Sequence, residues 1–214
     1  MSAIREQGRR IQCLNNLRQH GIAWYLYLAD HNDCFPKYGT DYSKGETGGS
    51  YFGGKKGYGG NQGPDASIRV LNRYLEIKDN LNPNVNLFHC PDDSKNYPGL
   101  SKNAFDTWGN SYNANTFVLA YSPSGNNLGP FEPRSIDSVT FPKNKVYLEH
   151  DTVGMKPGHG PAVGRVDNVP VMVLFVDGHV KGPFMSFSDF NFSNPRYNDP
   201  NKPVLLLPNS NYPQ

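Results

Sequence analysis

A long amphipathic segment opens the chain and constrains the fold more than any other feature. From Arg9 to Asp30, apolar residues recur at the spacing of an α-helix. At 100° per residue, one face of that helix carries Ile11, Leu14, Leu17, Gly21, Trp24, Tyr25 and Leu28. Between residues 22 and 29 the apolar residues surround the helix, which predicts a part enclosed by protein. The pattern predicts an N-terminal helical stalk over residues 1–31, with its C-terminal half packed on the rest of the chain.

Upstream of Arg10 the apolar stripe almost disappears. Residues 5–9 are Arg, Glu, Gln, Gly and Arg, so the near end of the helix has little with which to pack on its own domain. A helix that is packed at one end and bare at the other resembles a stalk cut from something longer. The chain itself contains no run of 18 apolar residues and no visible signal peptide.

Length and charge limit the classes of function. A chain of 214 residues fits a single domain or a domain with appendages. Its 21 basic residues against 19 acidic ones leave a net charge of +2, which argues against a nucleic-acid binder or a polybasic membrane module. The 22 glycines and 18 prolines indicate long irregular connections between the regular elements.

The residues after the stalk, 32–214, predict a globular head. Its first part is a Gly/Tyr-rich loop over residues 38–63, which is long enough to be functional or a packed surface insertion. A short helix is expected over residues 64–78, because Pro64 and Asp65 suit the first turn of a helix.

The second half of the head predicts β-structure. Apolar runs on both sides of Asp177-Gly178 predict a C-terminal hairpin over residues 170–184 with a tight type I′ turn. An Asn/Pro-rich tail follows over residues 185–214. The predicted fold class is α+β, with the long helix packed across a small antiparallel sheet and long irregular loops around it.

Three cysteines allow at most one internal disulfide. A continuous helix would hold Cys13 and Cys34 about 25 Å apart, whereas a disulfide needs Cα atoms within about 7 Å. The remaining alternatives are Cys90 with Cys13, Cys90 with Cys34, or three reduced thiols.

Candidate chemistry is sparse. Asp151 follows a strand and Asp177 lies in the hairpin turn, so the two carboxylates could converge on a calcium ion together with loop carbonyls. A hydrolase built on Glu149, His150 and Asp151 lacks a nucleophile–base pattern, and we therefore expect no catalytic residues. No other cofactor is expected.

The Gly/Tyr-rich loop suggests an alternative function. Tyr51 and Tyr58 could offer aromatic rings on a mobile scaffold for stacking on sugars or on an exported substrate. Aromatic residues in loops more often serve local packing. This alternative is a carbohydrate- or substrate-binding module of the cell envelope.

Two stretches resemble bacterial pseudopilin-like proteins with prepilin-type leaders. Residues 9–36, with Arg-Arg-Ile-Gln-Cys-Leu-Asn-Asn-Leu-Arg-Gln at their start, resemble the segment just after the membrane helix. Residues 173–181 resemble the C-terminal hairpin of the subgroup named for a histidine, nine residues and Asp-Gly. Residues 88–93 and 111–115 are similar to further pieces of that subgroup. One departure is clear, since Asp167 stands where the histidine is expected.

The resemblance implies a structural subunit of a type II secretion or type IV pilus-like filament. It implies a missing N-terminal helix that anchors the native protein in the inner membrane, with the domain in the periplasm or at the cell surface. The implied partners are copies of itself and other pseudopilins, packed through Ile4, Ile11 and Leu14. Major pseudopilins bind calcium in a C-terminal loop, which adds slight support to Asp151 and Asp177.

Overall fold

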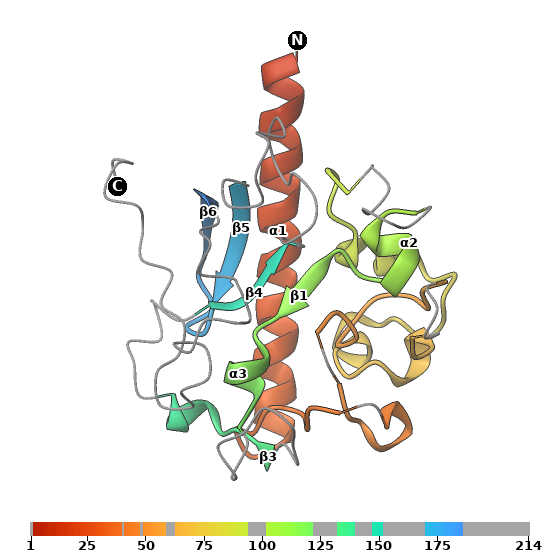
Figure 1. Ribbon diagram of the computed structural model, residues 1–214, viewed down its shortest axis with the longest axis vertical. Coiled ribbons are helices and arrows are strands. Elements are labelled where there is room, and N and C mark those ends of the chain that lie inside the picture. The colour runs from red at the N-terminus through yellow and green to blue at the C-terminus, as the bar shows by residue number, and fades with distance from the viewer. Residues whose placement is uncertain are drawn as a thin grey trace.

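The computed structural model places one long helix across a small antiparallel sheet (Figure 1). This arrangement confirms the predicted α+β fold class. The helix is α1 (Ser2–Asp30), and the head follows it in the chain. The structure describes residues 2–39, 41–47, 49–58, 63–93, 102–121, 132–139, 147–151 and 170–185.

α1 is a continuous helix of 29 residues, about 43 Å long at a rise of 1.5 Å per residue. It ends where Asn32 and Asp33 adopt left-handed conformations with φ of 52° and 59°, which these two residue types tolerate. The Asp33 N–H donates to the Leu28 carbonyl at 2.9 Å and closes the last turn. The polar residues that follow Asp30 therefore end the helix.

Four strands form the larger sheet in the order β1-β4-β5-β6, and each neighbouring pair is antiparallel. A second, two-stranded sheet pairs β2 with β3. α1 contacts β4, β5 and β6. The strand bounds are Tyr112–Ala114 for β1, Ala120–Tyr121 for β2, Glu132–Pro133 for β3, Tyr147–Asp151 for β4, Pro170–Phe175 for β5 and Val180–Met185 for β6.

The hairpin between β5 and β6 differs from the tight type I′ turn predicted for it. Gly178 has a φ of 86°, but Asp177 does not share the positive φ that a type I′ turn requires. Gly178 N–H donates to the Phe175 carbonyl at 2.9 Å, and Phe175 N–H donates to the His179 carbonyl at 2.9 Å. The Asp177 carboxylate accepts from the His179 N–H at 3.1 Å, which favours this longer loop.

The single helix expected over residues 64–78 is wrong, because two 3₁₀ turns replace it. They are η2 (Ala66–Ile68) and η3 (Asn72–Leu75), separated by Arg69 in an extended conformation. The Asn72 side chain bonds to both the N–H and the carbonyl of Gly54, at 2.8 and 2.7 Å. Such tertiary bonds hold the segment against the loop and override its local helical preference.

Several other short helices complete the head. The α-helices are α2 (Ala104–Trp108) and α3 (Thr116–Leu119). The 3₁₀ turns are η1 (Tyr42–Lys44), η4 (Pro83–Phe88) and η5 (Ile136–Ser138). Asn82 starts η4 by accepting from the Asn84 N–H at 2.9 Å, with Pro83 at the first position.

The prediction that residues 22–29 are enclosed on all sides is wrong. Trp24 and Leu28 are buried, but Ile22 is 54 % exposed and Leu26 is 47 % exposed. The head covers only one side of this part of α1. Apolar character around the whole circumference therefore does not mark full burial here.

Two predictions fall outside the described residues. Asp167, which stands in place of the subgroup histidine, is one of them. The other is the Asn/Pro-rich tail from residue 186 onward, because β6 ends at Met185.

Candidate functional site

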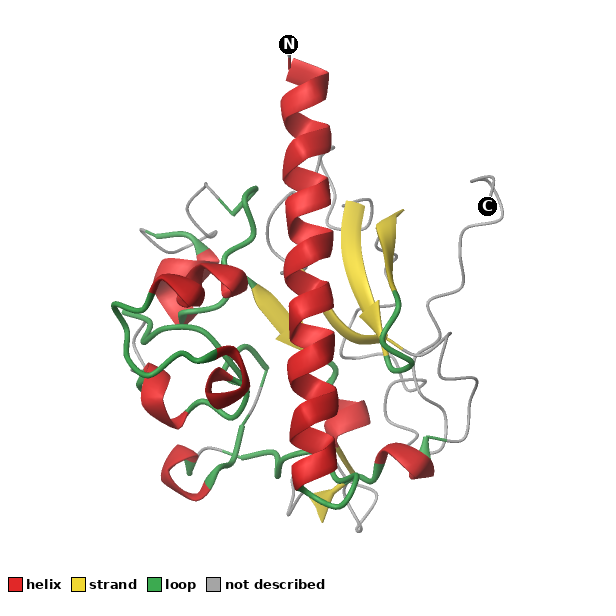
Figure 2. Cartoon of the chain, turned by 180° about the vertical axis from the view of Figure 1, so that it is seen from behind, coloured by secondary structure: helices red, strands yellow, loops and turns green. Residues whose placement is uncertain are grey.

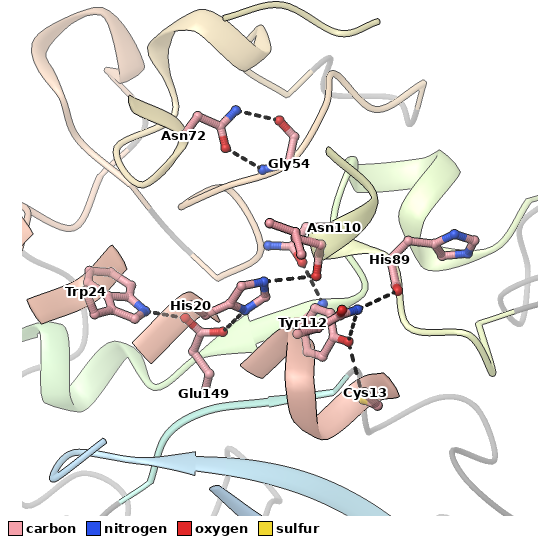
Figure 3. Close-up of polar contacts among 11 residues, drawn as sticks. Cys13, His20, Trp24, Gly54, Asn72, His89, Asn110, Tyr112 and Glu149 are labelled. Atoms are coloured by element: carbon pink, nitrogen blue, oxygen red, sulfur yellow. Dashed lines mark hydrogen bonds and ion pairs between the residues drawn. The ribbon is translucent and has the colours of Figure 1, made fainter. Parts of the chain in front are cut away.

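The inner face of α1 carries a buried polar anchor made of His20, Trp24 and Glu149 (Figure 3). Glu149 lies on β4 with no exposed surface, and its carboxylate accepts from the indole N–H of Trp24. His20 Nδ1 lies 2.8 Å from Glu149 Oε2, and His20 Nε2 lies 3.0 Å from the Leu87 carbonyl oxygen. The His20 ring stacks on Phe88 with centroids 4.2 Å apart. This anchor ties the helix to the sheet and to η4.

Both partners of His20 are hydrogen-bond acceptors. A neutral imidazole carries one N–H, so donation from both of its nitrogens requires an imidazolium beside the Glu149 carboxylate. Alternatively, a protonated Glu149 donates to Nδ1 while Nε2–H donates to Leu87. The pair has no net charge in either form, which accounts for its tolerance in a fully buried position.

A second buried cluster lies one to two turns nearer the N-terminus and centres on Tyr112 of β1. The Tyr112 hydroxyl lies 3.3 Å from Cys13 Sγ and accepts from Asn16 Nδ2 at 3.1 Å. The same amide nitrogen of Asn16 is 3.1 Å from the His89 carbonyl. Burial raises the pKa of Tyr112 well above its ordinary value, and the nearby thiols of Cys13 and Cys90 act in the same direction.

The outer face of α1, by contrast, exposes apolar side chains along the helix. Figure 2 shows α1 in front of the head, with no described element crossing it. We define the outer face by Ile4, Ile11, Ile22 and Leu26, which are 76 %, 52 %, 54 % and 47 % exposed. At 100° per residue these four positions fall within an arc of about 60°.

Two of the three residues assigned to filament packing belong to this face. Ile4 and Ile11 are exposed on it, whereas Leu14 is partly buried and packs against the core of the head. The outer face is interrupted at its middle by Asn15, whose side chain accepts a hydrogen bond from Arg18 at 2.7 Å. It is therefore a mixed surface with apolar residues towards both ends.

The near end of α1 is less bare than the sequence suggests. Arg9 forms an ion pair with Asp92, and Glu6 bonds to both Arg9 and Arg10 at 2.6 and 2.9 Å. These pairs raise the pKa of Arg9, first through the hydrogen bond that Arg9 donates to Glu6 and second through the charge of Asp92. The head thus holds the helix as far as its third turn.

The strand register separates Asp151 from Asp177, the two residues of the calcium hypothesis, along the sheet. Asp151 is the last residue of β4, and β4 runs antiparallel to β5 with Tyr147 opposite Phe175. Asp177 follows Phe175 in the hairpin, beside the first residue of β4 and not the last. Four residues of strand, about 13 Å, separate the two levels. Among the described residues, no group of three or more His, Cys, Asp or Glu is placed to hold a metal ion.

The Gly/Tyr-rich loop is packed rather than a free scaffold where it is described. Arg69 is buried and donates to the carbonyls of Gly53 and Trp108, both at 2.7 Å, and of Ser50 and Pro64. The same guanidinium lies over the Tyr51 ring, 5.5 Å from its centroid. Tyr51 is therefore part of the packing.

Among the residues of this loop whose exposure the structure describes, Tyr58 is the exposed aromatic one. Its ring is 74 % exposed, and Lys102 Nζ lies 4.2 Å from the ring centroid. Tyr51 and Tyr58 thus do not form one exposed stacking platform. A ligand stacked on Tyr58 would meet a ring that already has a cation over it.

The residues that organise the head are polar, and no sequence motif marks His20, Asn16 or Arg69, while Glu149 was considered only for a hydrolase. His20 and Asn16 are buried, but at 100° per residue both fall outside the face of α1 that the sequence predicts as apolar, so their helical position gave no signal. Glu149 follows Leu148 in strand β4, and no sequence motif includes it. Nothing local distinguishes Arg69 from a surface arginine.

Together, the fold and the helix define an α+β protein whose N-terminal helix is bound along one face and exposed along the other. Residues 2–165 match the DUF1559 family (SBP_bac_10), described as proteins of unknown function. The chain belongs to this family, whose bacterial members have prepilin-type features. No curated protein and no solved structure matches the chain. Within the described residues, no helix is both long enough and apolar enough to cross a bilayer.

Proposed function

We propose that the protein is a non-enzymatic structural subunit, a pseudopilin of a type II secretion or type IV pilus-like filament. The observation that carries this proposal is the outer face of α1. Ile4, Ile11, Ile22 and Leu26 are exposed on a helix whose opposite face is held by a buried polar anchor. Isolated exposed apolar residues are common, but a row of them along one rigid helix is typical of an interaction surface.

The rigid attachment of α1 supports the same proposal. A filament built on helices needs each helix fixed relative to its head, so that the heads repeat regularly around the core. The buried contacts of His20 and Asn16 and the partly exposed ion pair of Arg9 distribute this attachment over three turns of α1. The family's prepilin-type features agree with such a role.

The proposal includes the location of the native protein. We infer an inner-membrane anchor that precedes α1 and a head in the periplasm or at the cell surface. Cell fractionation of the full gene product, with extraction by alkaline carbonate, tests this part. Retention in the membrane pellet together with protease sensitivity in spheroplasts supports it, and recovery in the cytosol contradicts it.

Site-specific photo-cross-linking tests the assembly. A photo-reactive amino acid is placed at Ile11 or Ile22 of the full gene product, and at Leu81 as the matched control. Leu81 is an apolar residue that is 93 % exposed on the head. We expect adducts to a second copy or a related subunit from positions 11 and 22 and none from position 81. Equal adducts from all three positions, or none from α1, would overturn the proposal.

The alternative function as an envelope binding module now depends on Tyr58, because Tyr51 is engaged with Arg69. Titration with oligosaccharides, comparing the unaltered protein with Tyr58→Ala, tests it. Saturable binding that is lost in Tyr58→Ala would favour this alternative. Binding that is absent or unchanged would remove it.

A further inference from the structure

The segment from Leu87 to Asp92, which we term the strap, runs antiparallel along α1. His20 contacts the Leu87 carbonyl at 3.0 Å, and Asn16 contacts the His89 carbonyl at 3.1 Å. Further towards the N-terminus, Arg9 forms its ion pair with Asp92. As the position on α1 decreases from 20 to 9, the position on the strap increases from 87 to 92.

This register brings Cys13 and Cys90 to the same level. Seven residues of helix separate Cys13 from His20, a rise of about 10.5 Å. Three residues separate Cys90 from Leu87, and the chain leaves η4 at Phe88, so Cys90 directly follows the His89 that contacts Asn16. Along α1 and the strap, the two cysteines therefore lie between the Asn16–His89 contact and the Arg9–Asp92 ion pair.

Cys13 also faces the strap. At 100° per residue, Arg9, Asn16, His20 and Cys13 fall within an arc of about 60° on α1. Cys13 has no exposed surface, and its Sγ lies 3.3 Å from the Tyr112 hydroxyl. Cys90 is buried as well, and its thiol lies close enough to Tyr112 to act on that hydroxyl electrostatically. Figure 3 shows Cys13 beside the Tyr112 hydroxyl, the group on which both thiols act.

We propose that Cys13 and Cys90 are a redox site that closes to a disulfide between α1 and the strap. All three cysteines are thiols in the structure, which represents the reduced form of this site. Cys34 lies beyond the C-terminal end of α1, in an isolated bridge with Ser135, and stays outside the pair. The site is independent of the proposed assembly, and its closure would fix the near end of the helix covalently to the head.

The oxidant is a disulfide of the glutathione class or a thiol–disulfide oxidoreductase. One protein thiolate attacks the oxidant's S–S bond, forms a mixed disulfide and releases one thiolate. The second protein thiolate then attacks the protein sulfur of the mixed disulfide and releases the other thiolate. The two electrons reduce the oxidant's disulfide to two thiols, which take up the two protons of the cysteines. Because both cysteines are buried, this exchange takes place during folding or local opening.

Peptide mapping tests the pairing directly. The chain is refolded from denaturant in a mixture of reduced and oxidised glutathione, alkylated, and digested with trypsin without reductant. The three cysteines fall in separate tryptic peptides, namely 11–18, 79–95 and 19–37. We expect 11–18 linked to 79–95, with a loss of two of the three alkylatable thiols, and 19–37 recovered alkylated. Oxidation in denaturant is the control, in which no pairing should dominate.

Two results would overturn the proposal. One is recovery of 11–18 and 79–95 as alkylated or glutathione-bound peptides at oxidising ratios. The other is a link that involves 19–37. A second measurement uses Cys34→Ala, which keeps the proposed pair: its oxidised form should unfold at higher denaturant concentration than its reduced form. Equal midpoints of the two forms would count against a bridge in the native protein.

Discussion

His20 Nδ1 lies 2.8 Å from Glu149 Oε2, and neither side chain has exposed surface. The two residues are 129 positions apart in the chain, so their contact joins α1 to β4 directly. Trp24 donates to the other carboxylate oxygen, and the Leu87 carbonyl occupies the second ring nitrogen. Both carboxylate oxygens of Glu149, both ring nitrogens of His20 and the indole nitrogen of Trp24 therefore have a hydrogen-bond partner.

Replacing the carboxylate separates hydrogen bonding from charge. In Glu149→Gln, the amide oxygen accepts from Trp24, the amide nitrogen donates to His20 Nδ1, and neutral His20 donates to Leu87. We expect a loss of about 1 kcal/mol or less in the free energy of unfolding. Glu149→Leu leaves the Trp24 and His20 nitrogens without an acceptor and should cost about 3 kcal/mol or more.

Urea unfolding of both Glu149 variants measures this difference. Glu132→Gln, at an exposed position on β3, is the matched control and should change stability by less than about 0.5 kcal/mol. Equal losses in Glu149→Gln and Glu149→Leu would mean that the full charge of the carboxylate is required.

The two faces of α1 should respond differently to truncation. Leu17 is fully buried, so Leu17→Ala removes packed methyl groups and should cost about 2–5 kcal/mol. Ile11 is half exposed on the outer face, and Ile11→Ala should cost less than about 0.5 kcal/mol. Thermal or denaturant unfolding of the two variants checks this. A comparable loss in both would show that the outer face is covered in the isolated chain.

Arg69 should contribute far more to stability than its neighbour Arg73. Arg69→Met leaves the Gly53 and Trp108 carbonyls without their 2.7 Å donors, and we expect a loss of about 3 kcal/mol or more. Arg73→Met removes an exposed ion pair with Asp30 at 3.5 Å, which should cost less than about 1 kcal/mol. Denaturant unfolding gives both values. A small loss in Arg69→Met would show that the loop does not depend on this guanidinium.

Stability should fall at alkaline pH through buried tyrosines. Burial raises the pKa of Tyr27 from 10.0 to about 12. Between these values the unfolded chain has released the phenolic proton while the folded chain retains it, so the free energy of unfolding decreases as pH rises. The contribution is fully present below pH 10. Tyr112, whose pKa is also raised, acts in the same direction.

Tyr27→Phe tests this mechanism. We expect the variant to lose stability less steeply between pH 10 and pH 12, by at most about 1.4 kcal/mol per pH unit. Urea unfolding at several pH values measures the slope. Tyr58→Phe, which removes an exposed hydroxyl, serves as the control and should follow the unaltered protein. Identical slopes in Tyr27→Phe and the unaltered protein would contradict the assignment.

Sequence periodicity was sufficient for α1, because the residues that decide a helix and its stop at Asn32 and Asp33 are neighbours in the chain. It was insufficient for residues 64–78. There, the side chain of Asn72 bonds to Gly54, and the guanidinium of Arg69 bonds to Trp108. These partners lie 18 and 39 positions away, and they convert an apparent helix into two 3₁₀ turns.

For the apolar residues of α1, too, the sequence predicts the local structure but not the burial. Their spacing identifies the helix, but it assigns Ile22 and Leu26 to a buried part, whereas the structure exposes both. Which side of a helix is covered depends on where the sheet lies, and strand pairing sets that position. The calcium hypothesis was limited in the same way, since only the register of β4 against β5 separates Asp151 from Asp177.

From the sequence alone, the class of fold, the long helix and the C-terminal hairpin could be predicted, because each rests on short-range periodicity and turn chemistry. The tertiary structure decided which face of α1 is exposed, how His20 meets Glu149, and how Cys13 comes level with Cys90. The physical reason is that burial and long-range hydrogen bonds depend on which segments meet in space. Local propensity does not contain that information.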